Sequence, residues 1–185
     1  MSQTVLIPVA NGTEDIEAVT LIDVLRRAGM AVTVASVGNA REVTCANGTR
    51  IVADSLHADV AGRSFDLIAL PGGMPGAEHL RDTPALIAQL RAQDARGGLF
   101  AAICASPGVV LASHGLIGTR KATAYPGFEK LLPPGSFVAE RVVRDGHLVT
   151  SRGPGTALEF ALALVEAMGH GAQAEQLASG MLARR

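Results

Sequence analysis

The chain has 185 residues and a formal net charge of −1; 48% of its residues are hydrophobic, 18% charged and 3% aromatic. This length allows a full hydrophobic core and predicts one domain over residues 1–185. The balanced charge, without a basic cluster, argues against a nucleic-acid surface and against docking on an anionic membrane. We expect no membrane-spanning helix, since no apolar run approaches ~18 residues, and a cytoplasmic location, since the N-terminus lacks a leader pattern.

The first half of the chain is predicted to form a β-α-β unit followed by a hairpin. A continuous apolar run indicates a buried strand over 5–10, and an amphipathic pattern indicates a helix over 14–28. The alternating, valine-rich run 31–37 is typical of a second strand. An Asn-Gly pair predicts a tight turn inside a hairpin over 43–52.

The second half continues the alternation of strands and helices, which implies a mostly parallel α/β sheet with helices on both faces. In such sheets the functional site lies beyond the carboxyl ends of the strands. We therefore expect three loops that leave those ends, at 11–17, 71–76 and 104–106, to converge. The remaining predicted elements are strands over 66–70, 99–103 and 121–124, helices over 84–96, 105–112 and 157–168, a hairpin over 139–150 and a short C-terminal helix.

Cys104 lies on the predicted turn between a buried strand and a helix. Backbone N–H groups and the positive end of a helix dipole at such a turn favour the thiolate, which is the reactive form of cysteine. A strand–turn–helix arrangement also presents the nucleophile of many hydrolases. The alternative is a buried cysteine that acts as a small hydrophobe. The expected convergence of the three loops favours the nucleophile.

Glu17 stands inside the helix predicted over 14–28 and has two interpretations. Acids near a helix N-terminus are stabilised by the helix dipole, and this suffices for Glu14 and Asp15. A carboxyl that points into the end of the sheet would instead be partly buried, with a raised pKa, and could exchange a proton with a thiol. The helical pattern alone favours the first interpretation for Glu17.

Two glycine-containing segments could bind anions, whereas the cysteine spacing indicates no metal site. Backbone N–H groups in 71–76 could receive the oxyanion formed when a thiolate attacks a carbonyl, although glycines serve tight turns equally well. Arg152 precedes a predicted helix N-terminus and could hold an anion. Neither segment has the Lys-Ser/Thr pair of a P-loop. Cys45 and Cys104 form neither a disulfide framework nor a zinc pattern, and Cys45 is assigned to packing.

Four motifs occur in order along most of the chain: GTEDIEAV at 12–19, LPGGMPGA at 70–77, AAICASP at 101–107 and TSRGPGT at 150–156. As a set they resemble the ThiJ/PfpI superfamily, in the branch of the Parkinson-disease-associated deglycase and its bacterial homologues. The resemblance implies a flavodoxin-like three-layer sandwich with a mostly parallel sheet. It also implies a homodimer, with the first helix near the contact, and chemistry that needs no cofactor.

The same resemblance implies roles for individual residues. Cys104 would be the nucleophile and the oxidation-sensitive thiol, and Glu17 the carboxylic acid that hydrogen-bonds it. Gly73 and Ala105 would supply backbone N–H groups for the oxyanion. The predicted substrate contacts are Gly72, Tyr125 and Arg152.

The chain departs from the family pattern beside the thiol. Tyr125 stands where the best-known member of the branch has a histidine. Tyrosine can donate a hydrogen bond to a carbonyl but is a poor base near neutral pH, so proton transfer falls to Glu17. The protease-like branch has a histidine directly after its cysteine; because Ala105 occupies that position here, we do not expect peptidase activity.

Two functions follow from the residues and the resemblance. The first is a cofactor-independent glyoxalase or deglycase that acts through Cys104 on methylglyoxal or its adducts, so that its partners are a small dicarbonyl or a glycated protein. The second is a redox-responsive chaperone or oxidative-stress sensor that uses the same cysteine, since a low-pKa thiol is oxidised early. We expect the first function.

Overall fold

A computed structural model describes residues 2–183 and places seven strands in one sheet, in the order β5-β2-β1-β6-β7-β9-β8. Neighbouring strands of this sheet are parallel, except for the antiparallel pair β9 and β8. Strands β3 and β4 form a separate antiparallel hairpin. The strands are β1 (Thr4–Val9), β2 (Ala31–Ser36), β3 (Glu42–Thr44), β4 (Arg50–Val52), β5 (Ser55–Leu56), β6 (Leu67–Leu70), β7 (Leu99–Ile103), β8 (Val142–Asp145) and β9 (Leu148–Ser151).

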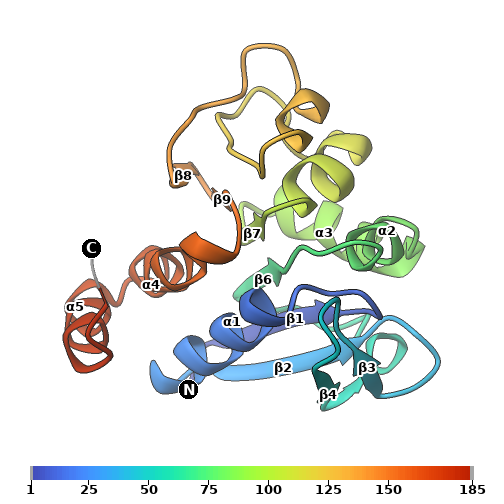
Figure 1. Cartoon of the computed structure of the whole chain (residues 1–185), viewed down its shortest axis with the longest axis horizontal. Helices are drawn as coiled ribbons and strands as arrows, with labels where there is room; N and C mark the ends of the chain where they lie inside the picture. The colour runs from blue at the N-terminus through green and yellow to red at the C-terminus, as the bar shows by residue number, and fades with distance from the viewer. Residues whose placement is uncertain (1, 184–185) are drawn as a thin grey trace.

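Helices lie on both sides of this sheet (Figure 1). Helix α1 packs on α4 and α4 packs on α5, whereas α3 packs on β7 and α2 packs on the turn that follows β7. This arrangement confirms the predicted flavodoxin-like α/β sandwich. The helices are α1 (Asp15–Arg27), α2 (Gly76–Arg81), α3 (Pro84–Ala95), α4 (Ala157–Ala167) and α5 (Gly171–Gly180).

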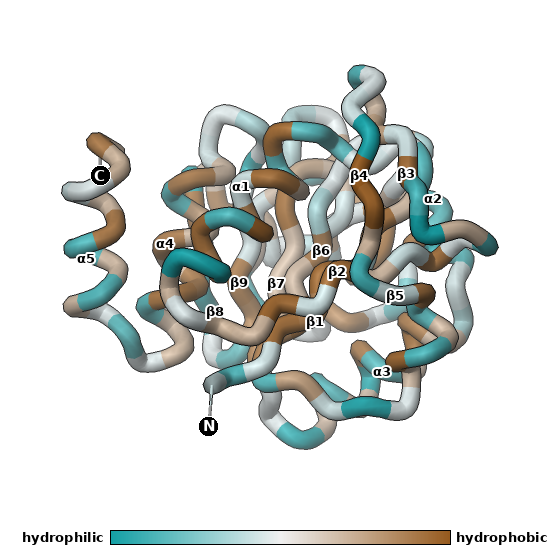
Figure 2. The backbone as a smooth tube through the Cα atoms, turned by 90° about the horizontal axis from the view of Figure 1, so that it is seen from below, coloured by the Kyte–Doolittle hydropathy of each residue, from teal (hydrophilic) through white to brown (hydrophobic). Residues whose placement is uncertain are grey.

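The core is built on β1, β6 and β7, which are neighbours in the middle of the sheet. All four residues of β6 are fully buried, as are Phe100 to Ile103 of β7. Strands covered by helices on both faces need apolar side chains on both faces, which explains the continuous apolar runs in the sequence. Figure 2 shows this difference between inner and outer elements: hydrophobic residues follow one another along β1, whereas hydrophilic and hydrophobic residues alternate along the outer helix α5.

Several short elements differ from the sequence-based expectations. Strand β5 and helix α2 were not predicted, because two residues and six residues are too short to carry a periodic signal. The strand predicted over 121–124 is wrong: only an isolated bridge joins Ala122 to Phe137. The predicted strands at 5–10, 31–37, 66–70 and 99–103 and the hairpin over 43–52 are confirmed to within a residue or two.

The segment after Cys104 is not the regular α-helix that was predicted. It forms a π-helical turn over Pro107–Leu111 and then a 3-10 turn over Ala112–His114. Pro107 is the first residue of this turn, a position where proline is tolerated because its missing N–H would have no helical partner. Gly108 lies so close to a neighbouring loop that a Cβ atom would be 2.7 Å from the carbonyl oxygen of Phe128.

Candidate active site

The three loops that were expected to converge do so at the carboxyl ends of β1, β6 and β7. The sheet order makes these strands neighbours, so the loops that leave them lie side by side. The backbone N–H of Glu14, after β1, donates to the carbonyl oxygen of Gly72, after β6, over 2.9 Å. The Ser106 hydroxyl, after β7, donates to the carbonyl oxygen of Pro71 over 2.6 Å. The candidate site therefore rests on the most buried part of the fold.

Cys104 occupies a strained turn at the end of β7. Its φ is +66°, a left-handed conformation that costs a residue with a side chain about 1–2 kcal/mol. Two backbone hydrogen bonds fix it there. Its N–H donates to the carbonyl oxygen of Ser151 over 3.0 Å, and its own carbonyl oxygen accepts the Tyr125 N–H over 2.9 Å. Strain that neighbouring bonds maintain at one reactive residue is typical of functional sites.

Gly72 allows the thiol and the carboxyl of Glu17 to approach one another. Its N–H donates to Glu17 Oε2 over 2.8 Å, in a buried bond. A Cβ atom on Gly72 would lie 2.6 Å from the Cβ of Cys104 and 2.9 Å from Glu17 Oε2. Any side chain at this position would therefore push the two groups apart. The structure shows Gly72 as a spacer in the site, and its predicted contact with substrate stays a prediction.

Glu17 is completely buried, with an exposed fraction of 0%. Burial raises its pKa to about 7, although the hydrogen bonds from the Gly72 N–H and the Cys104 side chain act in the opposite direction. Its Oε1 atom has no nitrogen or oxygen partner within the described residues. The helical pattern favours an acid that is stabilised by the helix dipole, and the complete burial of Glu17 contradicts that interpretation; the role that the family resemblance implies stays a prediction.

The turn that carries Cys104 is not enough to make the thiol ionise easily, which contradicts the expectation from the local sequence. Burial raises its pKa, and so do the charge of Glu17 and its hydrogen bond to the thiol. The backbone N–H groups of Gly73 and Ala105 lower the pKa. Because the charge of Glu17 opposes a second negative charge nearby, the thiolate is favoured when Glu17 holds the proton. The two groups therefore titrate as a pair.

The predicted donors and contacts lie around this pair. The backbone N–H groups of Gly73 and Ala105 interact with the Cys104 side chain and lower its pKa, and their oxyanion role stays a prediction. Tyr125 is 44% exposed, and its ring packs so closely on Gly153 that a Cβ there would be 2.8 Å from Cδ2. The guanidinium of Arg152 lies over the Phe137 ring, 5.7 Å from its centroid.

Histidine takes no part in the observed contacts of the thiol. The histidines that form side-chain hydrogen bonds make them elsewhere, to Gln89, Arg81, Asp94 and Gln3. Within the described residues, no group of His, Cys, Asp and Glu side chains could hold a metal ion. Glu17 is thus the titratable side chain beside Cys104.

The chain as a whole has clear relatives among known proteins. The sequence matches the DJ-1/PfpI family over residues 3–167. The chain belongs to this family. It is 46% identical over 185 residues to "Protein DJ-1 homolog A" of Arabidopsis thaliana, which covers 99% of this chain but only 47% of that relative. The chain thus spans about half the length of that plant protein.

Two further members of the DJ-1/PfpI family match almost end to end. "Glutathione-independent glyoxalase DJR-1.2" of Caenorhabditis elegans is 40% identical over 168 residues, or 90% of this chain and 88% of that protein. The solved structure "Toxoplasma gondii DJ-1, oxidized" superposes with a TM-score of 0.97 at 47% identity and covers 100% of both chains. The fold of this chain is therefore that of the family.

Asp15 has a role in this family member that the sequence analysis missed. Its Oδ2 accepts the Asn47 N–H over 2.8 Å and its Oδ1 accepts the Thr49 N–H over 3.0 Å. These bonds attach the loop of the β3–β4 hairpin to the N-terminus of α1, two residues from Glu17. Burial acts to raise the pKa of Asp15, but the hydrogen bonds from Thr49 and Asn47 outweigh it and the pKa is lowered. The helix dipole alone therefore does not explain the lowered pKa of Asp15, because these hydrogen bonds contribute to it.

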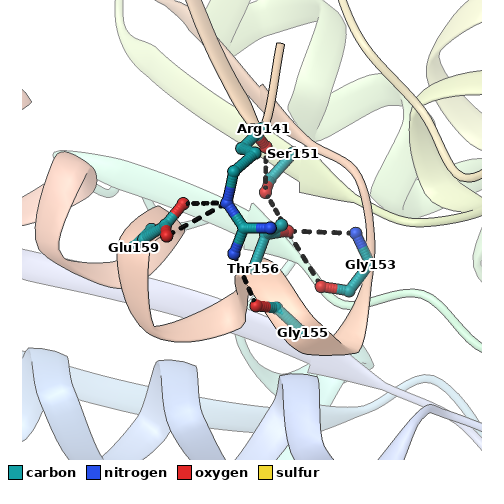
Figure 3. Close-up of polar contacts among 6 residues, drawn as sticks. All are labelled: Arg141, Ser151, Gly153, Gly155, Thr156 and Glu159. Atoms are coloured by element: carbon teal, nitrogen blue, oxygen red, sulfur yellow. Dashed lines mark hydrogen bonds and ion pairs between the residues drawn. The ribbon is translucent and has the colours of Figure 1, made fainter. Parts of the chain in front are cut away.

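The turn after β9 is held by a second network that the sequence analysis missed (Figure 3). Ser151 Oγ donates to the Arg141 carbonyl oxygen over 2.8 Å and lies 2.6 Å from Thr156 Oγ1. Thr156 Oγ1 also accepts the Gly153 N–H over 3.1 Å. Arg141 Nε contacts both carboxylate oxygens of Glu159, at 3.0 and 2.8 Å. Isolated hydroxyl and arginine residues give no signal for such a network, which depends on the fold.

A cavity of about 490 Å³ lies beside the site rather than over the thiol. It opens at the carboxyl ends of β1 and β2 and is lined by the loop after β2 and the turn between α2 and α3, including Ser36, Asn39 and His79. Cys104 does not line it. In the single chain, Cys104 as a residue is only 9% exposed, so that only small reactants can reach it.

The raised pKa of Glu17 makes stability depend on pH. The pKa of Glu17 is 4.5 in the unfolded chain and about 7 in the folded protein. Its contribution to the free energy of unfolding is therefore complete below pH 4.5 and is lost as the pH rises through 7. The wild type loses this contribution between pH 4.5 and pH 8, whereas Glu17→Gln has no carboxyl to titrate. The difference in unfolding free energy between the two proteins should therefore shift by about 3 kcal/mol in favour of the variant over this range. Denaturant unfolding at both pH values measures this, with Glu14→Gln as the control on the same turn. A difference between wild type and Glu17→Gln that stays constant with pH contradicts the assignment.

Proposed function

We propose that this protein is a glutathione-independent glyoxalase and deglycase, which converts methylglyoxal or its adducts through Cys104. The observation that carries the proposal is the buried pair of Cys104 and Glu17, with the N–H groups of Gly73 and Ala105 directed at the sulfur. The relative from Caenorhabditis elegans that bears the name of such an enzyme supports it. The proposed substrates are a small dicarbonyl or a glycated protein, and no cofactor takes part.

In the first proposed step, the sulfur of Cys104 adds to the aldehyde carbon of the substrate. The carbonyl π bond breaks, and the oxygen takes the electron pair. Backbone N–H groups of Gly73 and Ala105 stabilise this oxyanion, which then accepts the proton held by Glu17. The product of the step is a neutral hemithioacetal beside an ionised Glu17. A carboxyl group with a pKa of about 7 is well matched to donate and accept protons near neutral pH.

In the second proposed step, Glu17 moves a proton between the two carbons of the substrate. It removes the proton from the former aldehyde carbon, which forms an enediol, and returns a proton to the neighbouring carbon. The first carbon is thereby oxidised to a thioester and the second is reduced to an alcohol, so no external oxidant is needed. Water then hydrolyses the thioester, which releases the 2-hydroxy acid and restores the thiol. Tyr125 can donate a hydrogen bond to the substrate carbonyl.

This mechanism predicts lactate formation from methylglyoxal without glutathione. Cys104→Ser should abolish turnover because the nucleophile is lost, and Glu17→Gln should lower kcat by about 10²-fold or more because proton transfer is lost. Tyr125→Phe removes only a hydrogen-bond donor and should retain most of the activity. An enzymatic lactate assay on the purified proteins measures all four rates. Wild-type turnover no faster than that of Cys104→Ser would rule out the enzyme.

A second candidate function is a redox-responsive chaperone or oxidative-stress sensor. The N–H groups and the carboxyl that surround the sulfur could equally stabilise the oxygens of a sulfinate. The structural relative from Toxoplasma gondii is described as oxidized, which supports this alternative.

In either function, we propose a cytoplasmic setting, where thiols are kept reduced. The structure itself contains no described helix that is long and apolar enough to span a membrane.

Sensing predicts that Cys104 is oxidised ahead of every other side chain. Under graded peroxide, intact-mass analysis of the wild type should show the addition of two oxygens to Cys104 before any methionine is oxidised. Cys45 serves as the internal control, because it is the second free cysteine of the chain and is also buried, at 4% exposed. Oxidation of methionines or of Cys45 first would exclude the sensor.

We also propose a homodimer that forms through α1 and the β3–β4 hairpin. Ile16 and Val19 on α1 are 55% and 47% exposed, and Val52 on β4 is 67% exposed. Large apolar side chains clustered on a surface favour a protein contact. Val19 and Val52 also line a hollow of about 360 Å³ between these two elements, which a second copy could fill.

The proposed interface predicts a change of mass in solution. Size-exclusion chromatography with light scattering should show a dimer for the wild type and a monomer for the double variant Val19→Asp/Val52→Asp. Leu131→Asp, at a residue that is 54% exposed outside the interface, is the matched control and should stay dimeric. A monomeric wild type would refute the proposal.

A further inference from the structure

The turn that carries Arg152 lies directly beside the reactive thiol. Ile103 and Ser151 are partners in the parallel pair β7–β9, so Cys104 and Arg152 are the first residues beyond the ends of two adjacent strands. The bond from the Cys104 N–H to the Ser151 carbonyl oxygen continues this pairing over 3.0 Å. The side chain of Arg152 therefore starts from the strand end next to the one that carries Cys104.

Two arginines stand near this turn, and they have different surroundings. Arg141 is fully engaged: it binds Glu159 with Nε and donates from Nη2 to the Gly155 carbonyl oxygen over 2.8 Å (Figure 3). Arg152 forms no ion pair with any carboxylate in the described part of the chain. Its guanidinium instead lies over the ring of Phe137. Arg152 thus presents an uncompensated positive charge.

The backbone that presents Arg152 is fixed on both sides. The network of Ser151, Thr156 and Gly153 holds the turn after it, and the ring of Tyr125 packs on Gly153. The Phe137 ring restricts the guanidinium itself, since an arginine over an aromatic face gains a cation–π interaction. Ordering a side chain before a ligand arrives reduces the entropy lost on binding.

We propose that Arg152 selects substrates in which the reactive dicarbonyl carries a carboxylate. A guanidinium binds a carboxylate through two parallel N–H bonds, which the neutral methylglyoxal cannot accept. The substrate class is a 2-oxoaldehyde with a terminal carboxylate a few carbons from the aldehyde, and 4,5-dioxopentanoate is the simplest suitable probe. The proposal rests on the glyoxalase chemistry above, which would convert this probe to 2-hydroxyglutarate by the same balanced proton shift.

Steady-state kinetics with two substrates test this selectivity. Arg152→Gln should lower kcat/KM for 4,5-dioxopentanoate about tenfold or more, through a higher KM, and should change kcat/KM for methylglyoxal less than twofold. Arg63→Gln is the matched control, because Arg63 also lies over a phenylalanine ring, 5.2 Å from the centroid of Phe65, but far from the thiol. Equal losses for both substrates, or no loss for either, would overturn the proposal.

A second measurement separates this proposal from the proposed enzyme activity. Iodoacetate and iodoacetamide alkylate the same Cys104 thiolate, but only the first carries a carboxylate. The ratio of their rates therefore cancels any change in the pKa of the thiol. Arg152→Gln should lower this ratio about fivefold or more, and Arg63→Gln should leave it unchanged. A lower ratio in a protein without turnover upholds anion selection and rejects the enzyme; an unchanged ratio rejects anion selection.

Discussion

The site depends on one close contact, in which the carboxyl of Glu17 and the thiol of Cys104 meet across Gly72. The contact is possible only because position 72 has no side chain: a Cβ atom would be within 3 Å of both partners. The sheet order supplies the rest, since it places the loops after β1, β6 and β7 next to one another. The packing of the core therefore also sets the distance between the two groups of the candidate site.

Burial decides how protons are distributed in this contact. In water, a carboxyl group loses its proton well before a thiol does. Inside the protein, the cost of burying charge raises the pKa values of both groups, and the charge of Glu17 opposes a second charge on Cys104. The N–H groups of Gly73 and Ala105 lower the pKa of the thiol, but they do not outweigh these two effects. A pair that carries one proton and one negative charge serves a nucleophile and a redox sensor equally, which is why the same geometry supports both candidate functions.

The sequence predicted the parts of the fold that depend on local pattern. Continuous apolar runs indicated β1, β6 and β7, and the resemblance to a known family indicated Cys104 and Glu17 as partners. Helical periodicity alone misplaced Glu17, because the direction of its side chain is set by Gly72, which is 55 residues away in the chain. The dipole argument for Cys104 failed for a similar reason: burial and the charge of Glu17, which lies far away in the sequence, outweigh the local donors. The bonds of Asp15 to Asn47 and Thr49 likewise depend on packing between distant segments.

The left-handed backbone at Cys104 has a consequence for how the chain tolerates change. Glycine adopts this conformation without steric penalty, whereas a residue with a Cβ atom does not. The protein thus has, at the position that we propose as the nucleophile, a residue that the backbone disfavours. A residue with a Cβ atom at this turn costs folding stability, so stability and the proposed role of Cys104 make opposite demands on a single residue.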